Sequence, residues 1–168
     1  KENRALNVTI LGIGDIGTEM FLTTYWIGQM LDCKLRINVV SKEPDGTFED
    51  KLNYINPEIL KTTKKNDEIL RIYKDKEEFS EPYCEYKYFS CDVKSTEFNS
   101  LLKNVTVIAD THYFLVSLGS DEENLSVANM LKTEIGRIHI ANKARNEQVE
   151  KTIINYVVYN SSLNKLTL

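Results

Sequence analysis

Apolar residues in this chain form short strand-like runs that alternate with stretches of helical spacing. A run at 8–11 is followed by helical spacing up to about residue 32, and a β-branched run occupies 35–40. The alternation returns after residue 85. Further strands are predicted at 85–90, 113–118, 137–142 and 156–159, with helices at 97–102, 121–136 and 146–153. This predicts an α/β fold: a doubly wound, mostly parallel sheet of about six strands with helices on both faces.

Residues 43–82 interrupt this alternation. Pro44-Asp45-Gly46 is a turn signal, and the charged run at 74–78 has the composition of a solvated face or loop. Apolar residues between them have helical spacing that is interrupted near Pro57. We interpret 43–82 as an insertion after the second strand, with a lid, a dimer element and a partner surface as alternative roles. The apolar residues that offer surface for a dimer are Phe48, Ile55 and Ile59.

Composition narrows the class of protein. The 168 residues fit a single domain over 1–168, and the chain lacks an initiator Met, so we expect a piece of a longer protein. A net charge of −4 without a dense Lys/Arg tract argues against nucleic acid as a partner. No apolar run approaches the roughly 20 residues of a membrane span. Three cysteines without metal-ligand spacing favour a reducing, cytoplasmic setting and predict no metal site.

Three glycines lie where the first predicted strand passes into the first helix. Gly12, Gly14 and Gly17 have the G-x-G-x-x-G spacing of dinucleotide-binding Rossmann folds. In that motif the first glycine permits a tight turn, the second lets the backbone approach a pyrophosphate, and the third lets helix and strand pack closely. The helix N-terminus supplies free N–H groups to the phosphates. The alternative is a βα unit whose glycines serve only its turn and its packing.

The end of the second predicted strand departs from this pattern. Dinucleotide folds usually carry an acidic residue there for the ribose hydroxyls, whereas this chain has Ser41 followed by Lys42. Glu43 lies beyond the expected position. The Ser-Lys pair would accommodate a 2′-phosphate, which predicts less preference for NAD over NADP. The alternative is that the pair is a solvated loop.

Four motifs together resemble the nucleotide-binding domains of potassium-transport regulators, the regulator-of-K-conductance or Trk-A N-terminal type. They are GIGDIG at the first turn, CDV after the third strand, LGSDEENL after the fourth and NKARN after the fifth. Their order along the chain matches the family, while Ser41 and the 43–82 segment depart from it. The resemblance implies a cytoplasmic domain, on its own or at the cytosolic face of a membrane protein, that pairs with a copy of itself and regulates a membrane transport protein.

The resemblance also implies roles for individual residues. Asp92 and Val93 would lie beside the adenine, and Lys143 and Arg145 would lie near the mouth of the site, available to phosphates. Capping of the next helix by Asp92, and plain surface charge for the two basic residues, are the alternatives. The complete set of candidate cofactor-binding residues is Gly12, Ile13, Gly14, Asp15, Ile16, Gly17, Ser41, Lys42, Asp92, Val93, Leu118, Gly119, Ser120, Lys143 and Arg145.

No catalytic residue is assigned from the sequence. His112 and His139 lie at a strand entrance and inside a predicted strand, without an identifiable partner. We therefore expect a regulatory module that binds NAD or NADP, with ATP or ADP as the alternative ligand, and that has no chemistry of its own. The runner-up is the cofactor domain of an NAD(P)-dependent oxidoreductase, and a third possibility is a scaffold that binds only protein.

Overall fold

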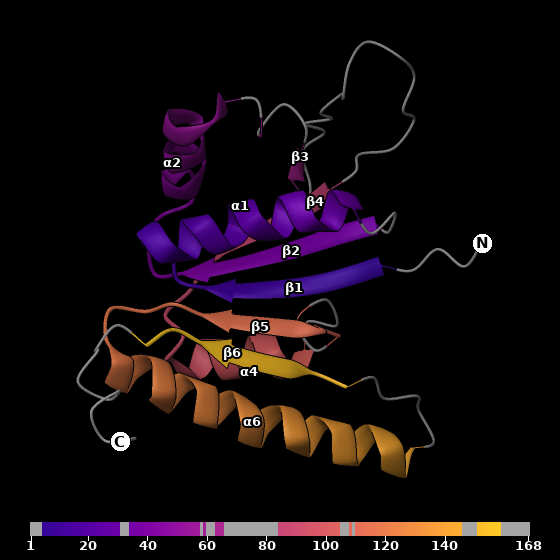
Figure 1. The fold of residues 1–168 in the computed structure, drawn as a ribbon. Helices are drawn as coiled ribbons and strands as arrows, with labels where there is room; N and C mark the ends of the chain where they lie inside the picture. The colour runs from indigo at the N-terminus through magenta and orange to yellow at the C-terminus, as the bar shows by residue number, and fades with distance from the viewer. Residues whose placement is uncertain are drawn as a thin grey trace, which may run out of the picture.

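The structure is a computed structural model that describes residues 5–30, 34–57, 59, 63–65, 84–104, 108, 110–145 and 151–158 (Figure 1). Its strands are β1 Ala5–Leu11, β2 Lys34–Ser41, β3 Thr63–Lys65, β4 Cys84–Ser90, β5 Tyr113–Val116 and β6 Ile153–Tyr156. Its helices are α1 Asp15–Met30, α2 Thr47–Ile55, α4 Thr96–Asn104 and α6 Asp121–Ala144. A described helix lies between successive strands except between β3 and β4.

The strands form one sheet in the order β3-β4-β2-β1-β5-β6, and every pairing between them is parallel. The chain winds outward from β1 through β2 and returns to β5 on the other side of β1. The order of strands therefore reverses beside β1. In open α/β sheets, ligands bind at such a point, outside the carboxyl ends of the strands.

Side chains alternate between the two faces of the sheet, so that each face has its own apolar core. Ile10 and Val39 pack under α1 and α2, while their neighbours Leu11 and Val40 pack under α4 and α6. Burial on both faces agrees with the second half of β2, which is buried at every position from Ile37 to Ser41. The prediction of a parallel α/β sheet with helices on both faces is confirmed, and the arrangement fits a Rossmann-like fold.

The strands expected at 8–11, 35–40, 85–90 and 113–118 correspond to β1, β2, β4 and β5. The strand expected at 137–142 is wrong, because these residues continue α6 to Ala144. The last strand lies at Ile153–Tyr156 rather than at 156–159. The helix expected at 146–153 lies partly outside the described residues, and Ile153 belongs to β6. The set of strands in the sheet therefore differs from the predicted set of six.

The length of α6 has a physical reason that the sequence also contains. Asn124, Ala128, Leu131 and Ile135 are buried at spacings of three and four residues, and Ile138 continues this face against the same core. Ile140, which a strand would have placed on one face with Ile138, is exposed. The sequence pattern predicts a helix end at Gly136. A single glycine inside a helix costs only about 1 kcal/mol, and the packing of α6 against the core outweighs that cost.

The first part of the 43–82 segment is a core element. Phe48 and Leu52 of α2 are buried on the sheet beside α1. Phe48 makes an edge-to-face contact with Phe21 of α1 at 4.9 Å between ring centroids, and it stacks on Tyr88 of β4 at 6.4 Å. The Tyr86 hydroxyl donates to Glu49 at 2.5 Å. Most of the segment beyond residue 59, including the charged run at 74–78, lies outside the described residues.

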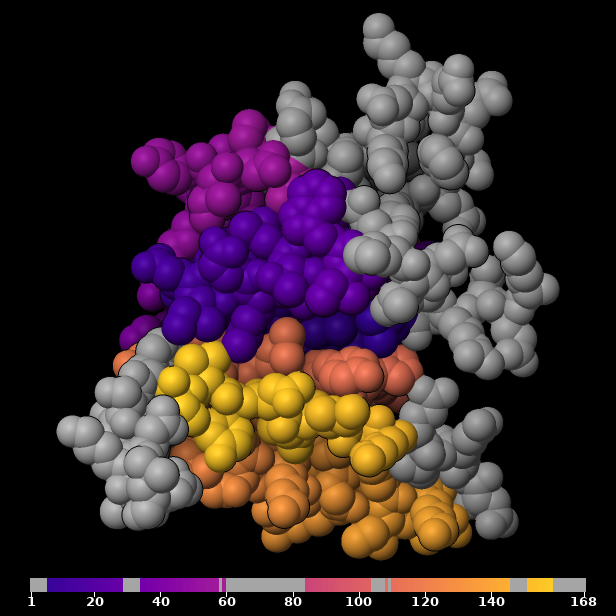
Figure 2. All heavy atoms as spheres, in the orientation of Figure 1, coloured from indigo at the N-terminus to yellow at the C-terminus, as the bar shows by residue number. Residues whose placement is uncertain are grey.

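The expected dimer surface on this segment is corrected by the same packing. Phe48 and Ile59 are 1% and 2% exposed, so they belong to the core of their own chain, and of the three residues only Ile55 is exposed. Exposed apolar side chains occur on several elements, among them Trp26 and Ile27 of α1, Tyr54 of α2, Tyr113 of β5, and Ile153 and Tyr156 of β6. Figure 2 shows β6 reaching the surface between α1 and α6. In the described part of the chain, no helix is long and apolar enough to cross a membrane.

A buried amide ties the end of the sheet to α6. The side chain of Asn124 is fully buried; its Oδ1 accepts from the Leu118 backbone N–H at 2.6 Å, and its Nδ2 donates to the Val157 carbonyl at 2.9 Å. The loops that follow β5 and β6 are therefore held by one residue of the first turn of α6. A buried backbone group left without a partner costs about 1–3 kcal/mol.

Replacement of Asn124 by alanine is therefore expected to lower the free energy of unfolding by about 2–3 kcal/mol, because both backbone groups lose their partner. Urea unfolding measures this change. Asn129→Ala is the matched control, since Asn129 lies exposed on the same helix. Equal stability of the two variants would show that Asn124 does not hold these loops.

Candidate functional site

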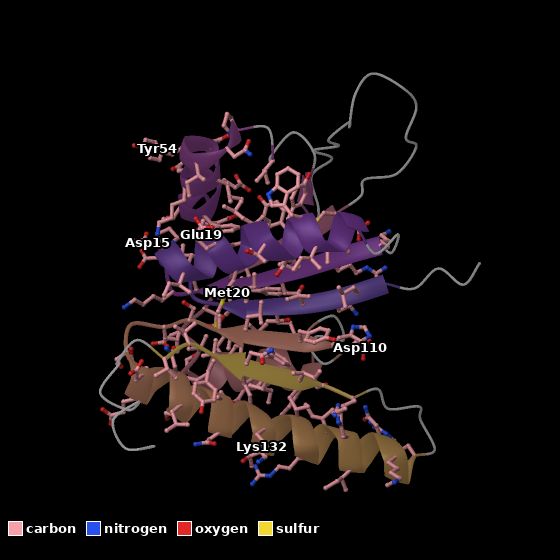
Figure 3. The ribbon with its side chains drawn as sticks, viewed as in Figure 1. Asp15, Glu19, Met20, Tyr54, Asp110 and Lys132 are labelled. Carbon is pink, nitrogen blue, oxygen red and sulfur yellow. The ribbon has the colours of Figure 1, made fainter. Side chains whose placement is uncertain are left out.

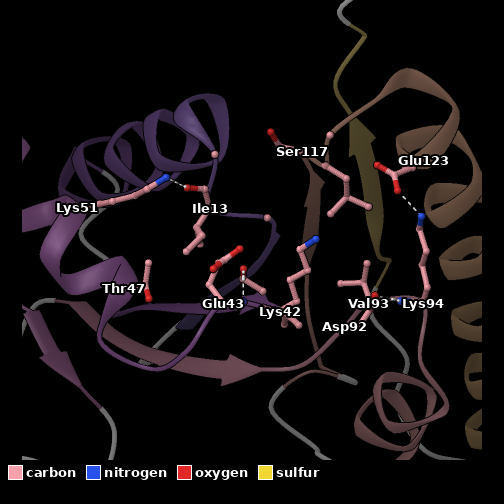
Figure 4. Close-up of a pocket in the computed structure, with 16 residues that line it drawn as sticks. Ile13, Lys42, Glu43, Thr47, Lys51, Asp92, Val93, Lys94, Ser117 and Glu123 are labelled. Atoms are coloured by element: carbon pink, nitrogen blue, oxygen red, sulfur yellow. Dashed lines mark hydrogen bonds and ion pairs between the residues drawn. The ribbon is translucent and has the colours of Figure 1, made fainter.

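A cleft of about 610 Å³ lies at the carboxyl ends of β1, β2, β4 and β5. It therefore occupies the place where the strand order reverses. Figure 4 shows how the loops after these strands, together with α2 and the start of α6, surround it. The residues that line it are Gly12, Ile13, Gly14, Val40, Ser41, Lys42, Glu43, Thr47, Lys51, Asp92, Val93, Lys94, Ser117, Leu118, Gly119 and Glu123.

Two of the three glycines are required by close backbone contacts. Gly12 has φ +100°, and a Cβ there would lie 2.0 Å from the Ser117 carbonyl oxygen. A Cβ on Gly17 would lie 2.1 Å from the carbonyl oxygen of Gly12. The turn is therefore pressed between the end of β5 on one side and α1 on the other. These two glycines have the turn and packing roles that the sequence predicts.

Gly14 differs, because a Cβ there would meet no atom within 4 Å. Its backbone conformation is also open to other residues, since among the described glycines only Gly12 and Gly46 have a positive φ. Gly14 lines the cleft directly before α1 begins at Asp15. Packing within the chain therefore does not explain a glycine at this position, whereas approach of a ligand to the backbone would.

The first turn of α1 offers unpaired donors next to Gly14. The first hydrogen bond of the helix runs from the Thr18 N–H to the Gly14 carbonyl at 2.9 Å. Within the described residues, the backbone N–H groups of Asp15, Ile16 and Gly17 receive no such partner. Free N–H groups and the helix dipole together favour an anion at this place.

The loop after β2 presents Glu43 and Lys42 rather than Ser41. Ser41 is buried, and its hydroxyl accepts from the Glu43 N–H at 3.2 Å. The Glu43 carbonyl accepts from the hydroxyls of Tyr88 at 2.8 Å and Ser90 at 3.0 Å, which fixes the loop on β4. Figure 4 shows the Glu43 carboxylate between Ile13 and Lys42 in the cleft. An acidic group therefore stands close to the end of β2, displaced by two residues along the chain.

Helix α2 adds a cation on the opposite side of the glycine turn. The Lys51 ammonium donates to the Ile13 carbonyl at 2.6 Å, across 38 residues of sequence. Thr47, in the first turn of the same helix, also lines the cleft. The 43–82 segment therefore supplies part of the cleft wall.

The loop after β4 brings Asp92, Val93 and Lys94 to the cleft. Val93 is buried, and Asp92 is exposed. One carboxylate oxygen of Asp92 accepts from the Lys94 backbone N–H at 2.9 Å, and the Asp92 carbonyl accepts from the Ser95 hydroxyl at 2.6 Å. Asp92 thus shapes the turn before α4 and also lines the cleft. The alternative that Asp92 caps the next helix is wrong, because the hydroxyl of Ser95 accepts from the Phe98 N–H at 3.2 Å and caps α4 instead.

The start of α6 closes the cleft on the side of β5. Ser120 caps the helix by accepting from the Glu123 N–H at 3.3 Å, as the S-x-x-E pattern predicts. The Glu123 carboxylate forms an ion pair with Lys94 from the loop after β4. The hydrogen bond from Lys94 lowers the pKa of the Glu123 carboxyl, and the nearby charge of Lys42 adds to this lowering. Both partners are thus charged at neutral pH.

Most of the candidate residues meet at this cleft. Gly12, Ile13, Gly14, Ser41, Lys42, Asp92, Val93, Leu118 and Gly119 line it. Asp15, Ile16, Gly17 and Ser120 flank it, at the starts of α1 and α6.

Lys143 and Arg145 are placed elsewhere, which corrects the expectation that they lie near the mouth. They belong to the C-terminal end of α6, whose 24 residues span roughly 36 Å from its start at the cleft. The error follows from the strand expected at 137–142, since a strand would have returned the chain to the cleft. A helix instead carries these residues to the opposite end of the sheet.

Several residues that line the cleft were not assigned from the sequence. Lys51 is distant in sequence and belongs to a segment interpreted as an insertion. Lys94, in the loop after β4, and Glu123, in the first turn of α6, meet only in the fold. Glu43 is not assigned from the sequence because the position expected for an acidic residue at the end of the second strand falls on Ser41. The sequence contains one signal for Glu43, the turn at 44–46. A turn so close to β2 directs the side chains before it toward the strand ends. The missed residues are Val40, Glu43, Thr47, Lys51, Lys94, Ser117 and Glu123.

The histidines and the described cysteines do not line the cleft. His112 accepts at Nδ1 from the Asn7 N–H at 3.0 Å, and His139 lies 3.4 Å from the Thr152 hydroxyl, both near the amino ends of the strands. Cys84 and Cys91 are buried free thiols whose pKa is raised by burial. Among the described residues, no group of three or more His, Cys, Asp or Glu side chains is arranged to hold a metal ion.

A second hollow of about 620 Å³ lies between α1 and α2 and shares Thr47 and Lys51 with the cleft. Asp15, Glu19 and Asp50 give it an acidic wall, and Tyr54 stands at its rim. Figure 3 shows Asp15, Glu19 and Tyr54 on the same side of the molecule. Lys51 therefore separates an acidic hollow from the glycine turn.

Comparisons of this chain with models of known protein families, with curated proteins and with solved structures give no match.

Proposed function

We propose that the cleft binds an adenine nucleotide, either NAD or a nucleotide such as ADP or ATP. The observation that carries this proposal is Gly14, a glycine that internal packing does not require, held between two glycines that packing does require. It lies beside the unpaired N–H groups of α1, where a phosphate is stabilised by backbone donors and by the helix dipole.

The rest of the cleft has groups suited to the other parts of such a ligand. Val93 and Leu118 provide apolar surface near the strand ends, and Asp92 has a carboxylate that accepts hydrogen bonds. Glu43 is an acceptor beside the glycine turn, and no hydrogen bond to its carboxylate is found in the described part of the chain. A base, a ribose diol and a diphosphate therefore each have a chemically suitable neighbour in one continuous cleft.

We infer that the domain senses this ligand and has no chemistry of its own. Support comes from the resemblance to regulators of potassium transport, together with the position of both histidines away from the cleft. Pairing with a second copy and control of a membrane transport protein belong to the same proposal. Calorimetry with NAD, NADP, ADP and ATP tests binding, and turnover of a bound cofactor would favour the cofactor domain of an oxidoreductase instead.

Replacement of Gly14 by valine is expected to weaken nucleotide binding at least about 10-fold, because the side chain would occupy the space that a phosphate needs. The fold is expected to persist, since a Cβ at this position meets no atom within 4 Å. Gly136→Val is the matched control, because Gly136 is equally open and lies inside α6. Calorimetry gives the affinities and thermal unfolding confirms the fold. Equal nucleotide affinity of the Gly14 variant and the wild type would place the phosphates elsewhere.

Replacement of Glu43 by glutamine is expected to weaken NAD binding about 10-fold, because a charged acceptor for the ribose hydroxyls becomes neutral. NADP should lose less or gain, since the repulsion between the carboxylate and a 2′-phosphate disappears. Titration of both cofactors measures the ratio of their affinities, and Glu97→Gln, an exposed glutamate on α4, is the control. A ratio that does not change would exclude Glu43 as the group that reads the ribose and leave that role to Lys42.

A further inference from the structure

We propose that Lys51 is a phosphate-binding residue, so that the ligand's diphosphate is held between the start of α1 and a cation supplied by α2. This inference rests on the proposed function and adds to it. The glycine motif by itself accounts only for the backbone side of a phosphate site. Lys51 approaches the same turn from a helix that begins 30 residues after Gly17.

The needs of the turn do not explain a positive charge at Lys51. The Ile13 carbonyl accepts from the Lys51 ammonium at 2.6 Å, because the Thr18 hydroxyl, 3.3 Å away, gives its one hydrogen to the nearer Gly14 carbonyl at 2.8 Å. A neutral donor would satisfy the Ile13 carbonyl equally well. The positive charge of Lys51 remains to be explained.

The charge of Lys51 is not paired directly, although Asp15, Glu19 and Asp50 line the hollow beside it. Within the described residues, Lys51 forms no ion pair with a carboxylate, and its only hydrogen bond is the one to Ile13. It lies beside the N-terminal turn of α1, whose dipole and free N–H groups are also positive. An anion bound between Lys51 and this turn would be attracted by both.

The surrounding charges fix the side on which this anion binds. The hollow beyond Lys51 is walled by Asp15, Glu19 and Asp50, which would repel a phosphate. The cleft side has the open Gly14 instead, and Figure 4 shows the Lys51 side chain reaching toward the turn at Ile13. The three hydrogens of a lysine ammonium allow it to keep the Ile13 contact and donate to a phosphate oxygen as well.

Titration of the folded protein with ADP tests this assignment. Lys51→Met is expected to weaken ADP binding roughly 10- to 100-fold, the range of one charge-assisted hydrogen bond. Lys51→Arg should keep most of the affinity because it keeps the charge and the donors. Lys132→Met, which removes an exposed lysine from the far helix α6, should leave ADP binding unchanged (Figure 3).

Two further measurements distinguish an effect of the Lys51 charge from an effect of Lys51 on the position of the turn. They are the salt dependence of ADP binding and the affinity of a neutral variant. ADP binding to the wild type should weaken as ionic strength rises, and this dependence should be smaller in Lys51→Met and in Lys51→Gln, because salt screens the lost attraction. Glutamine retains a donor for Ile13, so Lys51→Gln with wild-type affinity and wild-type salt dependence would overturn the inference. Thermal unfolding shows that each variant is folded.

The outcomes for Lys51 and for the proposed function differ. A wild type that binds ADP while Lys51→Met binds it equally well overturns the role of Lys51 alone. A wild type that binds none of NAD, NADP, ADP and ATP overturns the proposed function, and with it a phosphate contact for Lys51.

Discussion

The whole cleft depends on one close backbone contact, the approach of the glycine turn to the end of β5. Gly12 lies so near the Ser117 carbonyl that no side chain fits between them, and Gly17 lies equally near Gly12. The same region is fastened by hydrogen bonds from the Gly12 N–H to Val40 and from the Ser117 N–H to Leu11, each 2.9 Å long. Three strand ends are thereby fixed relative to one another. Because the strand order reverses at this place, the contact also sets the distance between the two halves of the cleft.

The polar groups that line the cleft around the glycine turn lie on elements that the hydrophobic core holds in place. The aromatic contacts of Phe48 with Phe21 and Tyr88 place α2, and only then does Lys51 reach the glycine turn. Hydroxyls of β4 hold the Glu43 loop, and Asn124 holds the backbone at Leu118. Lys51 and Glu43 are thus positioned by contacts with core elements. Such anchoring reduces the conformational entropy that a ligand would otherwise have to remove on binding.

The charges of the cleft divide it into two unlike ends. At the glycine turn, Lys51 has no direct carboxylate partner in the described chain and the first backbone N–H groups of α1 are free, while Asp15 and Glu43 lie nearby. At the β5 end, Glu123 pairs with Lys94, and Ser120 caps α6. The open anion-binding groups described above therefore lie at the glycine turn, whereas Lys94 at the β5 end is already paired.

The sequence by itself determined the strands β1, β2, β4 and β5 and the glycine turn, because strand periodicity and a glycine that needs positive φ are local properties of the chain. It did not determine the length of α6. Gly136 and the alternating isoleucines after it favour a strand locally, and only packing against the core from Asn124 to Ile138 decides for a helix. It also did not determine which charges face the cleft. Lys51, Glu43, Lys94 and Glu123 come from four segments, and their proximity exists only once the parallel sheet has brought its strand ends together.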